Sequence, residues 1–115
     1  MSKPHPTFRD LEPHWVRYDR AGIYDDEGVT KETAQGVAFL HPIQFAKNGG
    51  PRGTTTILVW FRDVGVPDDA TPGPGRWLRN GADLDNLTLT PSIDLTRGGQ
   101  SPDEWHGWVT AGVVS

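Results

Sequence analysis

Short stretches that alternate between apolar and polar residues recur along this chain, and the first of them lies at 14–19. Trp15 and Arg17 fall on one side of this stretch, and Val16 and Tyr18 fall on the other. Successive side chains of a strand point to opposite faces of its sheet. The two-residue period therefore predicts a strand that is buried on one face only.

A continuous apolar run marks the strongest predicted strand, which spans 54–64. Its middle, 57–61, contains no polar residue, and such a run is typical of a strand buried on both faces. A second apolar stretch, 36–45, predicts a strand that ends near His41. Pro42 ends it because proline has no N–H for the strand ladder and restricts the residue before it.

Three further segments complete the predicted β structure. The segment 75–81 is a short strand, and 87–95 is a strand interrupted by Pro91. Because proline cannot donate to the ladder, this strand is expected at a sheet edge or at a bulge. The last segment, 106–115, is predicted to form a hairpin that turns at 110–112.

Glycine and proline interrupt the chain so often that long helices are not expected. The 115 residues include 14 Gly and 10 Pro, and a chain of this length suits one domain. We predict a mainly β protein: a single compact antiparallel domain over 1–115, sandwich-like or a curled sheet, with 1–10 as a flexible N-terminal segment. At most one short helix is expected, as a single turn at Thr30–Gln35. Four tryptophans are predicted to be largely buried: Trp60, Trp77, Trp105 and Trp108.

Charge and cysteine content narrow the possible functions. The chain has 15 acidic and 11 basic residues, a formal net charge of −4. Nucleic-acid-binding proteins rely on clustered Lys and Arg, so no nucleic-acid partner is expected. The chain has no cysteine, which excludes disulfides and cysteine-ligated zinc. No segment has the apolar run of a signal peptide or a membrane span, so we expect a soluble, cytoplasmic protein without membrane association.

His41, Asp103 and His106 form the first candidate site. Two imidazoles and a carboxylate suit Zn, Fe or Mn, and zinc is the metal expected if one binds. Glu104 would then act as a general base through a bound water. The alternative is that no cofactor binds and that His106, which lies between two tryptophans, is a packed residue hydrogen-bonded to its surroundings.

Ser92 is the second candidate, as a nucleophile for which His106 would be the base. The chain lacks the Gly-x-Ser-x-Gly elbow that exposes many catalytic serines. A serine after Pro91 is also typical of a turn or bulge whose hydroxyl bonds a nearby backbone group. If the surface binds a partner without catalysis, the candidate contacts are Ser92, Trp105 and Trp108.

The motifs "LTLTPSID" and "EWHGWVTAGVV" resemble those of a family of small phage, prophage and bacterial proteins of unassigned activity, whose members are often labelled ammonia monooxygenase. The resemblance covers 76–114 well and the middle of the chain loosely. In the family, a Cys-Pro-x-Cys pair and a Cys-x-x-His pair look like a structural zinc site. Laid on that pattern, His41 and Gln44 stand at the first pair, and Asp103 and His106 at the second. Only His106 keeps the family's residue type.

The predicted function is protein binding, by a small soluble phage- or prophage-type accessory protein whose partner is a host or phage protein. A metal-dependent hydrolase that uses the His41, Asp103 and His106 set is the alternative. A virion structural component is a second alternative. It requires self-association, through an exposed edge near Pro91 or through an apolar face on a symmetric dimer.

Overall fold

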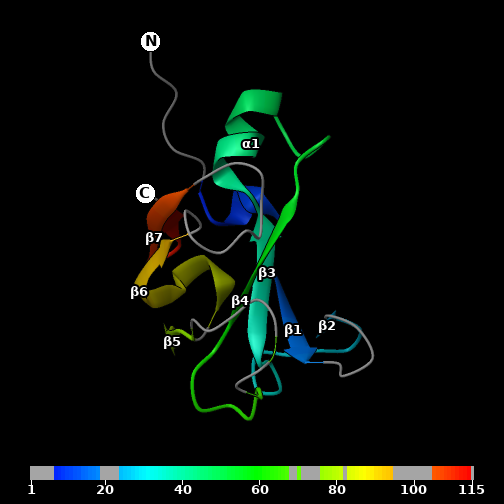
Figure 1. Ribbon diagram of the computed structural model, residues 1–115, viewed down its shortest axis with the longest axis vertical. Coiled ribbons are helices and arrows are strands. Elements are labelled where there is room, and N and C mark those ends of the chain that lie inside the picture. The colour runs from blue at the N-terminus through cyan, green and yellow to red at the C-terminus, as the bar shows by residue number, and fades with distance from the viewer. Residues whose placement is uncertain are drawn as a thin grey trace.

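Two antiparallel β-sheets dominate the computed structural model of the chain (Figure 1). The structure describes residues 7–18, 24–67, 70, 76–81, 83–94 and 105–114, with the backbone alone at 24, 25 and 94. Each sheet has four strands, and one short α-helix accompanies them in these described ranges. The predicted fold class, a mainly β antiparallel domain, is confirmed.

The first sheet has the strand order β2-β1-β3-β4, and every pairing in it is antiparallel. Its strands are β1 at His14–Tyr18, β2 at Tyr24–Asp25, β3 at Gly36–Leu40 and β4 at Thr56–Trp60. β1, β3 and β4 lie within predicted strand segments. β2 lies outside all of them, and its two residues are too few to show a period.

The second sheet has the strand order β5-β6-β7-β8 and is also antiparallel throughout. Its strands are β5 at Leu78–Asn80, β6 at Thr88–Asp94, β7 at His106–Thr110 and β8 at Val113–Val114. β7 and β8 form the predicted terminal hairpin. Val109 pairs with Val114 in it, and Thr110 pairs with Val113.

Neighbouring backbone continues the second sheet at both of its edges. Phe61, which follows β4, forms a parallel bridge with Trp77, which precedes β5. The Trp77 N–H donates to the Trp60 carbonyl over 3.0 Å and strengthens this junction between the two sheets. At the opposite edge, Thr7 bridges Val113 of β8.

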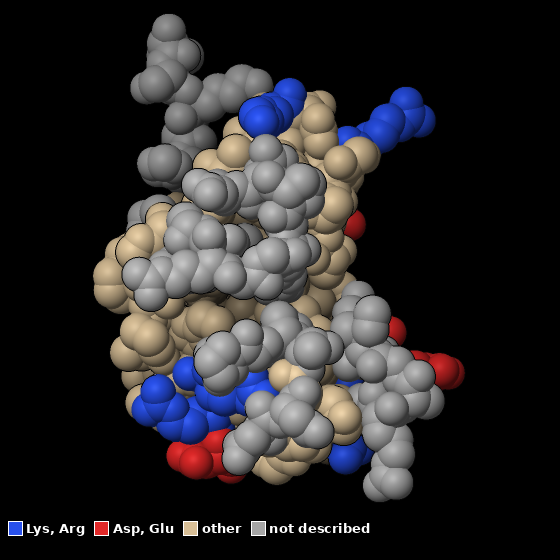
Figure 2. Space-filling model, viewed as in Figure 1, with Lys and Arg blue, Asp and Glu red and all other residues tan. Residues whose placement is uncertain are grey.

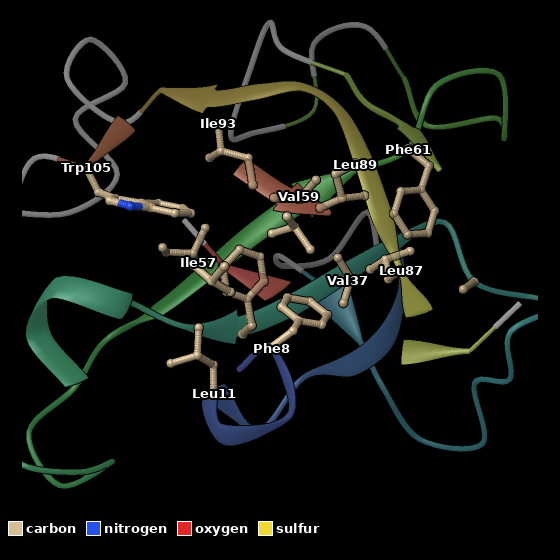
Figure 3. Close-up of a cluster of buried hydrophobic side chains, with 14 residues drawn as sticks. Phe8, Leu11, Val37, Ile57, Val59, Phe61, Leu87, Leu89, Ile93 and Trp105 are labelled. Carbon is tan, nitrogen blue, oxygen red and sulfur yellow. The ribbon is translucent and has the colours of Figure 1, made fainter. Parts of the chain in front are cut away.

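The largest cluster of buried side chains lies between the two sheets (Figure 3). β3 and β4 supply one side of the cluster, and the segments around β6 and β7 supply the other. Its fully buried members from these segments are Val37, Phe39, Ile57, Val59, Leu87, Leu89, Ile93 and Val109. Burial of one such side chain contributes roughly 1.5–3 kcal/mol before the entropy of ordering the chain is subtracted.

A smaller buried cluster covers the other face of the first sheet. It consists of Val16, Ala38, Leu58 and Trp60. Ile57 and Val59 alternate with Leu58 and Trp60 along β4 and point to the larger cluster. The prediction that this strand is buried on both faces is therefore confirmed.

Pro91 lies in the interior of the second sheet. β6 pairs with β5 on one side and with β7 on the other. The Thr90–Pro91 peptide is cis, and the register against β7 shifts between Leu89 and Ile93. The predicted bulge is thus confirmed, whereas the predicted sheet edge is wrong, because the irregular register accommodates the missing N–H within a central strand.

The helix occurs at a place that the sequence analysis assigns to a strand end and a loop. α1 spans Pro42–Asn48 and directly follows β3. Thr30–Gln35, where one helical turn is predicted, instead contains a hydrogen-bonded turn in which the Thr33 N–H donates to the Thr30 carbonyl over 3.1 Å. Pro42 suits the first turn of a helix because its missing N–H would have no partner there in any case.

The N-terminal segment departs from the flexibility expected of 1–10. Phe8 is fully buried in the larger cluster, where its ring meets the Phe39 ring edge-on at 5.0 Å. The Phe8 N–H also donates to the Gly112 carbonyl over 3.0 Å. These contacts fix the segment from Thr7 onward, and residues 1–6 lie outside the described ranges.

A surface ion pair connects the two short 3₁₀ helices, η1 at Arg9–Leu11 and η2 at Leu84–Asn86. Arg9 donates two hydrogen bonds to the Asp85 carboxylate, at 2.8 and 2.7 Å. The guanidinium thereby lowers the pKa of Asp85. Both side chains are exposed, so the pair adds little stability.

Candidate functional site

The outward side of β7 carries the most exposed tryptophan of the described chain. Gly107 and Val109 of this strand are buried, whereas His106, Trp108 and Thr110 are exposed. Trp108 retains 49% of its accessible surface. The prediction that Trp108 is largely buried is therefore wrong, because the alternation of β7 puts it on the same side as His106.

Side chains of the neighbouring strands extend this surface. The register pairs Leu78 of β5 with Thr90 of β6, and Thr110 of β7 with Val113 of β8. We call this surface the outer face and define it by Leu78, Asn80, Thr88, Thr90, Ser92, His106, Trp108, Thr110 and Val113. Leu78 and Val113 are not among the predicted binding residues. The two-residue period of their strands would indicate that both side chains face outward.

The outer face combines apolar and polar side chains. Leu78 and Val113 are 46% and 55% exposed. Together with Trp108, they are the most exposed large apolar residues among those that the structure describes. None of the nine residues that define the face is Lys, Arg, Asp or Glu. Asp94, whose backbone pairs with His106 at the end of β6, is outside this set because its side chain is not described. In Figure 2 the surface at the left, over β6 and β7, is accordingly tan.

A hydrogen bond joins two of the predicted site residues on this face. Ser92 Oγ lies 2.8 Å from His106 Nε2. Ser92 is held in place by its backbone, since its carbonyl accepts a hydrogen bond from Trp77 Nε1 over 3.2 Å. The structure thus brings together the serine and histidine that the sequence analysis considers as nucleophile and base.

The Ser92–His106 pair provides one part of a nucleophilic site. Such a site also needs a group that orients the second imidazole nitrogen and donors that stabilise the oxyanion. Among the described side chains, Ser92 is the one hydrogen-bond partner of His106, and the pair lies on an open sheet face. The described geometry is that of a serine–histidine hydrogen bond on the exposed side of the sheet.

His41 lies inside the protein. It is fully buried, and its Nδ1 accepts hydrogen bonds from the backbone N–H groups of Ile43 and Gln44 at 3.1 and 3.4 Å. The imidazole thereby caps the N-terminus of α1, a place usually taken by Ser, Thr, Asp or Asn. The ring also lies 6.4 Å from the ring of Trp105.

Gln44, which the resemblance aligns with a zinc ligand, is also buried and hydrogen-bonded. Its Oε1 accepts hydrogen bonds from the Thr55 N–H and Thr55 Oγ1, at 2.7 and 2.8 Å. The Gln44 side chain thus holds α1 against the segment before β4, whereas the His41 side chain caps α1 itself.

The three predicted metal ligands are described only in part. Asp103 and the predicted base Glu104 lie outside the described residues, and the described side chains contain no group of three or more His, Cys, Asp or Glu residues that suits a metal. His41 packs against the buried Trp105, whereas His106 is exposed and bonds Ser92. The zinc site stays a prediction, and Trp105 belongs to the core.

Replacement of His41 tests whether this residue is structural. His41→Ala is expected to lower the free energy of unfolding by about 2–3 kcal/mol, because it removes the α1 cap and leaves space against Trp105. His41→Asn should recover about 1 kcal/mol of this loss, since asparagine caps helices well. Urea unfolding measures both variants. A loss below about 0.5 kcal/mol for His41→Ala would contradict the structural role.

Arg79 has a structural role on the inward side of β5. Its guanidinium lies 4.3 Å from the centre of the Trp15 ring, and its Nη1 donates to the Lys31 carbonyl over 2.7 Å. Burial lowers the pKa of Arg79, and the nearby Glu32 partly opposes this shift. The stacked guanidinium joins β5 to the first sheet.

Comparisons with protein-family models, with curated proteins and with solved structures find no match to the chain. Within the described residues, no helix has the length and apolar character needed to cross a membrane. The residues themselves therefore carry the functional argument, and the outer face is the feature that combines exposure, apolar area and defined geometry.

Proposed function

We propose that this chain is a protein-binding accessory protein and that the outer face is its binding surface. The exposure of Trp108 on a paired strand carries the proposal. Tryptophan is enriched among the residues that dominate binding energies, because one indole contributes roughly 150–250 Å² of contact area. Leu78 and Val113 add apolar area on either side of it.

The strand pairing beneath the outer face suits a binding role. Trp108 lies on β7, which pairs with β6 on one side and β8 on the other, so a partner would meet a surface that is already ordered. A preformed surface avoids the entropy cost of ordering a loop on binding. The Ser92–His106 pair would add directional hydrogen bonds to the apolar contact.

The resemblance of the "PSI" and "HGW" motifs to small phage and prophage proteins suggests the setting. We propose that the partner is a phage or host protein and that binding occurs in the host cytoplasm. The formal charge of −4 disfavours a nucleic-acid partner.

Comparative co-purification tests the proposal. Tagged wild-type protein and its Trp108→Ala variant are incubated with extract of the cells that carry the gene, and the bound proteins are quantified by mass spectrometry. Loss of a central interface tryptophan costs about 2 kcal/mol or more, so a true partner should be recovered roughly 30-fold less with the variant.

Ile43→Ala is the matched control, because Ile43 is also an exposed apolar residue, at 38%, but lies on α1. The control variant should recover the partner as well as wild type does. A partner that both variants retain equally would show that binding occurs elsewhere, and this result would overturn the proposal.

A further inference from the structure

We infer that Asn80 is a site of spontaneous deamidation, in which the backbone nitrogen of Gly81 attacks the side-chain amide of Asn80. Asparagine reacts most readily when glycine follows it, because glycine has no Cβ and lets its backbone approach the preceding side chain closely. The chain contains two such dipeptides, one at 48–49 and one at 80–81. The structure distinguishes them, and the inference does not depend on what the outer face binds.

The contact between Asn80 and Gly81 brings the reacting groups together. The Gly81 N–H donates a hydrogen bond to Asn80 Oδ1 over 2.9 Å, so the attacking nitrogen already lies beside the carboxamide. The Asn80 side chain is exposed at the end of β5, where water reaches it. Rotation of this exposed carboxamide about its Cβ–Cγ bond turns Cγ toward the Gly81 nitrogen.

The reaction releases ammonia and consumes water. The Gly81 nitrogen forms a bond to Asn80 Cγ, the Cγ–Nδ2 bond breaks, and the side-chain nitrogen leaves as ammonia with the proton of the Gly81 N–H. Water then opens the cyclic imide at one of its two carbonyl carbons. Opening at Cγ gives aspartate, and opening at the backbone carbonyl carbon gives isoaspartate, whose main chain runs through Cβ and Cγ. Either product is about 1 Da heavier and carries a new carboxylate.

Asn48 also precedes a glycine, but its reacting groups are held apart by other hydrogen bonds. It is the last residue of α1, and the Gly49 N–H donates back into that helix, over 3.4 Å to the Ala46 carbonyl. The Asn48 side-chain amide donates to Thr54 Oγ1 over 3.2 Å. Both hydrogen bonds must break before the Gly49 nitrogen reaches Asn48 Cγ, and they should make the reaction roughly tenfold slower there than at Asn80.

The two products affect the fold differently. Aspartate keeps the normal backbone and adds a carboxylate at an exposed position of the outer face. Isoaspartate lengthens the main chain by one carbon beside Gly81, where even an added Cβ would collide with the Asn86 carbonyl. We therefore expect the isoaspartate form to unfold at a lower urea concentration than the Asn80→Asp variant, which carries the same charge on a normal backbone.

Mass spectrometry of the purified full chain, incubated in warm, mildly alkaline buffer, tests the inference. Peptide mapping at successive times follows the mass gain at Asn80 and, as the internal control, at Asn48. We expect Asn80 to react roughly tenfold faster in the folded chain. In concentrated urea the two sites should react at similar rates, because each follows a basic residue and precedes a glycine. Asn80→Gln should abolish the faster reaction, since glutamine must close a larger ring, and Asn48→Gln should leave it unchanged.

Two results would overturn the inference. In the first, Asn80 of the folded chain loses its amide no faster than Asn48 does. In the second, the preference for Asn80 persists undiminished in urea, so that the flanking sequence and not the fold is its cause. Circular dichroism melts confirm that both glutamine variants are folded.

Discussion

Replacing Trp60 with alanine is expected to remove a large part of the protein's free energy of unfolding at 25 °C. Trp60 is fully buried, and its ring meets the Tyr18 ring edge-on at 5.9 Å. Gly36, its partner in the β3–β4 register, leaves room for the ring where a methyl group would collide with it. Such a truncation costs about 3–5 kcal/mol, which is a large share of the roughly 5–15 kcal/mol that stabilises a typical domain. Urea unfolding followed by circular dichroism measures this loss.

Trp108→Ala is the matched control for Trp60→Ala, since it removes the same side chain from an exposed position. We expect it to change the free energy of unfolding of the monomer by no more than about 0.5 kcal/mol. Equal losses for the two substitutions would contradict the assignment of Trp60 to the core and of Trp108 to the outer face.

Gly112→Ala is expected to destabilise the protein by about 2–5 kcal/mol. Gly112 lies in the turn between β7 and β8 at φ 79°, where an L-residue is strained. A Cβ at this position would also collide with the backbone carbonyl of Asp85. Its own N–H donates to the Leu87 carbonyl, so a shift of the turn would weaken that bond as well. Chemical denaturation of the variant gives the size of the loss.

Gly28→Ala separates the two causes of this loss. Gly28 has a similar φ of 69°, but a Cβ there would meet nothing within 4 Å. Its replacement should cost only about 1 kcal/mol, from the backbone conformation alone. If Gly112→Ala costs no more than Gly28→Ala, the tight approach of the β7–β8 turn to Asp85 is wrong.

The strands could largely be predicted from the sequence because their patterns are local. The apolar run 57–61 indicates burial on both faces of β4, and Pro91 indicates an irregular strand. Whether such a strand lies at an edge or in the middle of a sheet depends on pairings with residues distant in the sequence. The irregular β6 therefore lies between two neighbours although its proline suggested that an edge was possible.

α1 shows how one residue can support two interpretations. Pro42 ends a strand, and it also suits the first turn of a helix. Gly49, at φ 69°, follows the last helical residue as a glycine commonly does. These two signals mark a short helix at 42–48, but its cap is the His41 imidazole, which sequence rules do not anticipate.

The candidate site could be predicted only in part. The proposed encounter of Ser92 with His106 required their strands to be neighbours, and the register shift near Pro91 determines how close they come. Trp108 is exposed because it lies two residues from each of the polar residues His106 and Thr110, and alternate residues of a strand share one face. The prediction that Trp108 is buried is based on the size and hydrophobic character of tryptophan. It is wrong because the position of Trp108 in the alternating pattern of β7 decides which side it faces.

The central claim is that the outer face is the binding surface of this protein. Hydroxyl-radical footprinting of the tryptophans, in the dilute chain and in the complex recovered with its partner, tests this claim most directly. We predict that Trp108 is oxidised fastest in the dilute chain, that the complex protects it strongly, and that the buried Trp60 and Trp105 react slowly in both. Unchanged oxidation of Trp108 in the complex, with protection at residues outside the outer face, would contradict the claim.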